Sequence, residues 1–129
     1  RPSMYIALYN LAAVAHAEGD YALATSRFAE ALTLSVAMRD TGNAAHCLHA
    51  LGVVAAARGA PTLAVRLWGA AETVLGSAEG ANYPHAADRS LYEESVAATR
   101  ARLGAPEWDA LWDEGRRLSV EEARAAALG

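Results

Sequence analysis

The sequence contains an internal repeat with a spacing of forty residues. Segment 8–32 (LYNLAAVAHAEGDYALATSRFAEAL) and segment 48–72 (LHALGVVAAARGAPTLAVRLWGAAE) carry similar residue types in the same order. The matched positions are Leu8 with Leu48, Leu11 with Leu51, Ala12 with Gly52, Ala15 with Ala55, Gly19 with Gly59, Ala24 with Ala64, Phe28 with Trp68, and Ala31 with Ala71. Self-similarity at a fixed period indicates a repeat architecture, in which stacked units bury a continuous core.

The residue types within the repeat favour helices. Apolar residues make up 53% of the 129 residues, and many of them are Ala, the strongest helix former. Val, Ile and aromatic residues are too scattered to build strands. We therefore expect one all-α domain of antiparallel helix pairs, arranged as a right-handed solenoid with a C-terminal helical cap and about seven helices.

Start and stop signals give the expected boundaries. The expected helices are a first that ends at Gly19-Asp20, a second that ends near Arg39 before the breaker 40–43, a third over about 44–58, a fourth over about 61–75, a fifth from Pro84 to Gly104, a sixth from Pro106, and a last one behind the capping box Ser119-x-x-Glu122. The domain then divides into repeat 1 (about 4–40), repeat 2 (about 43–76), a loop (76–83) and an extension (84–129).

Helical spacing also predicts which side chains face inward. These are Tyr5, Leu8, Leu11, Ala12 and Ala15 of the first helix; Ala24, Phe28, Ala31, Leu32 and Val36 of the second; Tyr92, Val96, Thr99 and Leu103 of the fifth; Trp108, Leu111, Trp112 and Gly115 of the sixth; and Val120, Ala123 and Leu128 of the last.

Charge and cysteine content narrow the class of protein. The net charge of -4 and a pI near 5.5 argue against direct nucleic-acid contact, which needs clustered positive charge. All eleven basic residues are Arg, so the lysine of a phosphate-binding loop is absent from this segment. The single Cys47 suits a reducing cytoplasm, and no apolar run is long enough for a membrane span. The first residue is not Met and the last helix is Ala-rich, so we expect a fragment of a longer protein.

The repeat resembles the tetratricopeptide repeat. Leu8, Leu11, Ala12, Gly19, Tyr21, Ala24, Phe28 and Ala31 match its consensus types, as do Leu48, Leu51, Gly52, Gly59, Ala64, Trp68 and Ala71. Ala15 and Ala55 replace its usual Tyr, and Val36 lies near the position of its helix-ending Pro. The missing Pro fits a longer second helix, and therefore a period of forty residues instead of 34.

The C-terminal part has a narrower resemblance. The strings AVRLWGAAETVLG (64–76) and ARLGAPEWDALWDEGRRLSVEEARAAAL (101–128) are similar to the end of the repeat region in bacterial multidomain regulators of the MalT-like and LuxR-type class. In these regulators an ATPase module precedes the helical repeats. The resemblance implies a non-catalytic, signal-sensing module that binds a protein or peptide, a small molecule or another domain of its parent, and it implies no catalytic residue.

The resemblance also implies a binding groove, because the first helix of each tetratricopeptide repeat lines the concave surface. The expected groove residues are Ile6, Tyr9, Asn10, Ala13, His16, His46, His49, Val53 and Ala56. The basic and Asn pattern that clamps a terminal carboxylate in some members is absent.

Two alternatives come from individual residues. His46 and His49 are neighbours on one helix face and could share a metal with His16 or His85, whereas Cys47 points about 100° away. We favour buried packing for Cys47, half-exposed histidines and no metal or cofactor. Trp108 and Trp112 could form an edge for homodimerisation, but a cap over the last repeat is the favoured interpretation.

Enzymatic chemistry has little support in this sequence. The carboxylates of the C-terminal helices alternate with Arg, which is typical of a solvated face, and no Ser lies in a G-x-S-x-G elbow. We therefore expect that this domain is not an enzyme.

Overall fold

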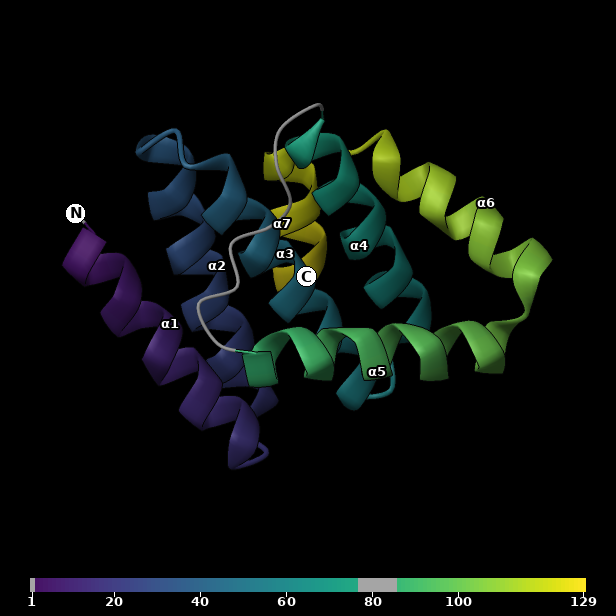
Figure 1. Cartoon of the computed structure of the whole chain (residues 1–129), viewed down its shortest axis with the longest axis horizontal. Coiled ribbons are helices and arrows are strands. Elements are labelled where there is room, and N and C mark those ends of the chain that lie inside the picture. Colours follow the sequence, from purple (N-terminus) through teal and green to yellow (C-terminus); the bar gives the residue numbers. More distant parts are fainter. Residues whose placement is uncertain (1, 77–85) are drawn as a thin grey trace.

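The computed structural model describes residues 2–76 and 86–129, and the side chains of 4–76 and 88–129. Its elements are α1 (Pro2–Ala17), α2 (Tyr21–Ala37), α3 (Thr41–Ala57), α4 (Pro61–Leu75), α5 (Ala86–Leu103), α6 (Ala105–Arg116) and α7 (Val120–Leu128) (Figure 1). All seven elements in these ranges are helices, which confirms the predicted all-α class. The predicted loop beyond Gly76 and the predicted helix start at Pro84 lie outside the described residues.

The first four helices pack in chain order, α1 on α2, α2 on α3 and α3 on α4. The next helix, α5, runs across α3 and α4 (Figure 1). Its successor α6 packs along α4, and α7 contacts α2, α3 and α4. No helix within the described ranges is long and apolar enough to cross a bilayer.

The turn inside each helix pair follows the predicted signals. Gly19 and Gly59 adopt positive φ angles of 82° and 88°, which an L side chain rarely adopts. After the first turn, the side chain of Asp20 accepts a hydrogen bond from the backbone N–H of Leu23 at 3.2 Å. Pro61 occupies the first turn of α4 instead, where a missing N–H costs nothing. Both predicted turns are confirmed.

The prediction for the junction between the two pairs was wrong. α2 ends at Ala37 and α3 begins at Thr41, so the expected breaker 40–43 is mostly the first turn of α3. The chain reverses at Arg39, which takes a positive φ of 57° although it is not Gly. The side chain of Asp40 then accepts hydrogen bonds from the backbone and side-chain nitrogens of Asn43, at 3.0 and 2.7 Å. These capping bonds outweigh the low helix propensity of the residues that follow.

Three predicted core side chains are exposed. Leu11 is 56% exposed on the face of α1 that points away from α2, Val36 is exposed while its neighbour Ser35 is buried, and Leu128 is exposed while Ala127 is buried. In each case the helix is rotated about its axis, so that a neighbouring residue faces the core in place of the large apolar one. The contacts of small residues therefore set these rotations.

Trp68 lies at the centre of the core and explains one difference between the two repeats. Its side chain is fully buried, and a Cβ added at Gly52 would overlap the indole Nε1. The first repeat has Ala12 and the smaller Phe28 at the equivalent positions. Gly52 thus provides the space that the larger ring needs.

The C-terminal helices cover the second pair closely. A Cβ added at Gly115 would overlap the backbone of Arg66, and one added at Gly69 would overlap the Trp112 carbonyl, so α4 and α6 approach backbone to backbone. Trp108 is 5% exposed and its ring centroid lies 6.0 Å from that of Trp68. This burial favours the cap over the association edge, because only the half-buried Trp112 retains appreciable exposure.

The predicted capping box at the start of α7 is confirmed. The backbone N–H of Glu122 donates to the Ser119 hydroxyl at 3.0 Å, and the backbone N–H of Ser119 donates to the Glu122 carboxylate at 2.8 Å. Two otherwise unpaired donors at the helix start are thereby satisfied.

Candidate functional site

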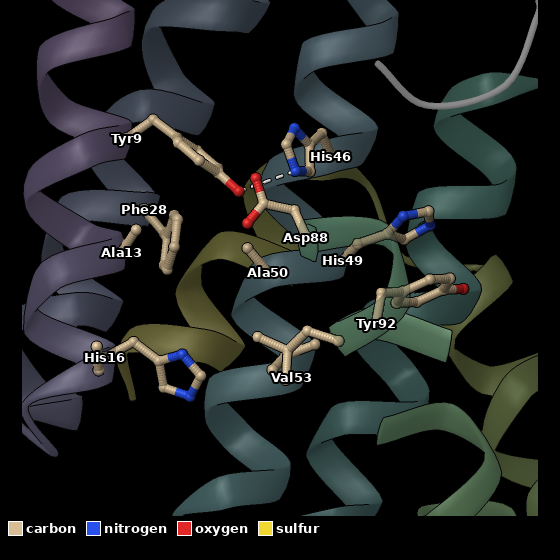
Figure 2. Close-up of a pocket in the computed structure, with 12 residues that line it drawn as sticks. Tyr9, Ala13, His16, Phe28, His46, His49, Ala50, Val53, Asp88 and Tyr92 are labelled. Atoms are coloured by element: carbon tan, nitrogen blue, oxygen red, sulfur yellow. Dashed lines mark hydrogen bonds between the residues drawn. The ribbon is translucent and has the colours of Figure 1, made fainter. Parts of the chain in front are cut away.

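A cavity of about 260 Å³ lies where α5 covers α1 and α3 (Figure 2). It is lined by Tyr9, Ala13, His16 and Ala17 of α1, Phe28 of α2, His46, His49, Ala50 and Val53 of α3, and Asp88, Leu91 and Tyr92 of α5. Most of this lining is apolar or aromatic. Such a lining with a few convergent polar groups is typical of a small-molecule site.

The cavity brings together most of the predicted groove. Tyr9, Ala13, His16, His46, His49 and Val53 all line it. Ala56 instead lines a neighbouring hollow together with His16 and Val53. Ile6 is 56% exposed and Asn10 is also exposed, and neither lines this cavity, because their positions on α1 turn away from α3.

Sequence reasoning missed the third wall of the cavity. Asp88, Leu91 and Tyr92 come from α5, which the structure places across the groove. The period-3.6 pattern indicated that Tyr92 faces inward, but no sequence signal showed what it would contact. The predicted groove is therefore not an open surface, because α5 covers part of it.

Tyr9 and His46 join the first helices of the two repeats. The Tyr9 hydroxyl and His46 Nε2 share a hydrogen bond of 3.0 Å, and the ring centroids are 4.8 Å apart (Figure 2). The Phe28 ring meets the Tyr9 ring edge-on at 5.3 Å. This cluster orients the Tyr9 hydroxyl at one end of the cavity.

His49 is held on the opposite side by Tyr92. Their rings stack with centroids 3.9 Å apart and planes 12° apart. Burial, followed by the electrostatic influence of His46, lowers the pKa of His49 to about 3, so this imidazole is neutral at pH 7. Burial also raises the pKa of the Tyr92 hydroxyl to about 12, with smaller contributions from Glu72 and Glu93. The prediction of half-exposed histidines was wrong for His46 and His49, which are 2% and 8% exposed.

Asp88 is the acidic side chain of the lining. Figure 2 shows its carboxylate directed towards the end of the cavity where Tyr9 and His46 meet. Its Oδ2 atom is buried and has no hydrogen-bond partner among the residues that the structure describes. A buried carboxylate oxygen without a partner is costly, which makes this atom the most informative polar group of the site.

The histidine and cysteine cluster does not converge. Cys47 is fully buried on the other side of α3, where its thiol donates to the Tyr5 hydroxyl at 3.7 Å and burial raises the thiol pKa to about 12. The predicted packing of Cys47 as a buried side chain is confirmed. Over residues 2–76 and 86–129, no three His, Cys, Asp or Glu side chains are placed to share a metal ion, and His85 lies outside these ranges.

No family model, no curated protein and no solved structure matches this chain. Any functional proposal for this chain therefore rests on the chemistry of the cavity. The lining offers aromatic faces, the neutral imidazole of His49 and one carboxylate, and its Tyr9 and His46 side chains hydrogen-bond one another. These are the features of a binding site.

Proposed function

We propose that this domain is a non-catalytic, signal-sensing module of a bacterial transcriptional regulator, and that its signal is a small molecule bound in the cavity between α1, α3 and α5. The observation that supports this function is the partly open, largely apolar cavity at the surface where a binding groove was expected. The regulator context rests on the resemblance of segments 64–76 and 101–128 described above.

The position of α5 favours a small molecule over a peptide. Tyr9, His46 and His49 were expected to line a binding groove, yet all three are buried where α5 covers α1 and α3. The cavity volume of about 260 Å³ lies just below the range of about 300–1,000 Å³ that is usual for drug-sized ligands. A compact molecule with one ring fits this space.

A ligand at this position would contact three helices at once. It would stabilise the arrangement in which α5 lies against α1 and α3, because a ligand shifts an ensemble towards the state that it binds best. Gly104 joins α5 directly to α6, which packs on α4. Ligand binding in the cavity would thereby affect the positions of the C-terminal helices.

Filling the cavity is expected to weaken ligand binding without unfolding the domain. Ala50 is half-buried in the lining, and Ala50→Leu places a larger side chain in the space that a ligand needs. We expect benzyl alcohol, detected by saturation-transfer NMR, to bind the wild type at least roughly tenfold more tightly than Ala50→Leu, a difference of about 1.4 kcal/mol. Circular dichroism should show unchanged helix content.

The matched control is Ala97→Leu, which adds the same atoms to an exposed position of α5. This variant should bind like the wild type. Equal binding by Ala50→Leu and the wild type would place the probe elsewhere and contradict the proposed function.

A second candidate function, self-association, is favoured by the outer face of α1. Met4, Ala7, Leu11 and Val14 are all exposed there. Their spacing of three, four and three residues is that of the a and d positions of a coiled-coil seam. Forty residues later the corresponding residues are Ala44, Cys47, Leu51 and Val54, and all four are buried. We propose that a second copy of the chain covers this face, with α1 packed on α1 about a two-fold axis.

Light scattering over a concentration range tests this association. We expect the apparent mass to rise towards that of a dimer in the wild type and to remain monomeric in Leu11→Glu, because the seam would then bury an unpaired charge. Leu23→Glu, at an exposed position of α2, is the matched control and should behave like the wild type. A wild type that stays monomeric at millimolar concentration would rule out this candidate.

A further inference from the structure

We infer that the cavity selects a small organic cation, namely an ammonium or amidinium group attached to an aromatic or apolar body. This inference rests on the proposed function, because it assigns a ligand class to the same site. It is carried by the Asp88 carboxylate, whose buried Oδ2 lacks a hydrogen-bond partner in the described part of the chain, and by the aromatic rings that share the cavity with it.

The charge of the lining is unbalanced. Asp88 contributes a carboxylate, and none of the residues that line the cavity is Arg. The nearest basic residue along the chain, Arg89, lies within 3.8 Å of the Glu93 carboxylate and does not line the cavity. His49 carries no charge at neutral pH, and burial lowers the pKa of His16 as well. A ligand cation would place a full positive charge beside the Asp88 carboxylate, in a lining that contains no Arg.

The aromatic rings favour the same kind of ligand. Tyr9, Phe28 and Tyr92 approach the cavity from three different helices. Ring faces carry partial negative charge, and they attract an ammonium or guanidinium group that lies within about 6 Å of the ring centroid. An ammonium beside Asp88 would therefore be stabilised by the carboxylate and by neighbouring ring faces at the same time.

The remaining lining determines what carries the cation. Val53, Leu91 and Ala50 are apolar residues of the same cavity, and Figure 2 shows Val53 away from the Tyr9 to His46 hydrogen bond. A hydrocarbon or aromatic body would be desolvated there, which is favourable by about 25 cal/mol per Å² of apolar surface. An anion of the same shape would meet the Asp88 carboxylate, and a neutral alcohol would supply only an uncharged hydrogen bond.

The test compares three probes that share a benzyl group and differ in the polar group attached to it, namely benzylamine, benzyl alcohol and phenylacetate, by NMR titration of the full chain. The wild type should bind benzylamine at least tenfold more tightly than benzyl alcohol, and phenylacetate most weakly. Asp88→Asn keeps the size of the side chain and removes its charge, so it should bind benzylamine and benzyl alcohol with similar affinity. Glu94→Gln, which removes an exposed carboxylate from the same helix, should leave the preference for the amine unchanged.

Equal affinity of the wild type for amine and alcohol would overturn the assignment of a cation while leaving the proposed function intact. The same conclusion would follow if Asp88→Asn retained the preference for the amine. If none of the three probes bound, both the ligand class and the proposed function would be overturned. Should Asp88→Asn disturb the start of α5, the wild-type comparison of amine with alcohol decides the question by itself.

Discussion

Replacing Trp68 by Ala is expected to lower the free energy of unfolding by about 4 kcal/mol, the largest effect of any single substitution that we propose. The side chain is fully buried at the point where α3, α4, α5 and α6 meet. Its ring meets that of Tyr92 edge-on at 5.8 Å, and its Nε1–H donates to the His49 carbonyl at 3.1 Å. The substitution would leave a cavity in the centre of the core and remove the indole hydrogen bond to the His49 carbonyl.

Urea denaturation followed by circular dichroism measures this effect. Leu23→Ala is the control, because Leu23 is exposed on α2 and its truncation should change stability by no more than about 0.5 kcal/mol. A loss below about 1.5 kcal/mol in Trp68→Ala would show that the four helices repack around the missing ring and that Trp68 does not organise the core.

The same substitution should also loosen the ligand cavity. Tyr92 lies between the Trp68 indole and the His49 imidazole, edge-on to the first and stacked on the second. Without the indole, one side of Tyr92 loses its packing and the wall of the cavity that α5 provides becomes less ordered. Weaker probe binding by Trp68→Ala than by Leu23→Ala would connect the core of the second repeat to the site.

Much of the fold could be predicted because it follows from local patterns. Apolar residues at helical spacing and the two turn glycines identified the first two helix pairs, and the Ser119 capping box identified the start of α7. The reversal at Arg39 could not be predicted. A positive φ at a non-glycine residue leaves no sequence signal, so the third helix was expected to begin three residues too late.

Only the part of the candidate site that belongs to the two repeats could be predicted from the sequence. The α1 and α3 residues of the cavity followed from the resemblance, since it specifies which helices face the groove. The contribution of α5 depends on where the chain returns after the second pair, and segment 76–83 carries no signal for that direction. For the same reason His46 and His49 were expected to be half-exposed, whereas the structure buries them.

Acidification from pH 6.5 to pH 5 is expected to destabilise the domain by about 2 kcal/mol through His49 alone. Burial lowers the pKa of His49 in the folded state to about 3, whereas in the unfolded chain it takes its ordinary value near 6.5. Between these two values the unfolded state binds the proton and the folded state does not. Stability is therefore complete above pH 6.5 and falls as the pH decreases, by about 1.4 kcal/mol for each pH unit.

The variant His49→Phe isolates this contribution, because it keeps an aromatic ring for Tyr92 to stack on and removes the titrating group. Urea denaturation at pH 6.5 and pH 5 should show a pH dependence in this variant that is smaller than in the wild type by about 2 kcal/mol. Burial also lowers the pKa of His16, which affects stability in the same direction. Because His16 is present in both proteins, its effect cancels in the comparison. The carboxyl groups are the same in both proteins, so they cancel in this comparison as well. An identical pH dependence in both proteins would mean that the His49 imidazole can be protonated within the folded state, and therefore that water or an acid reaches the cavity beneath α5.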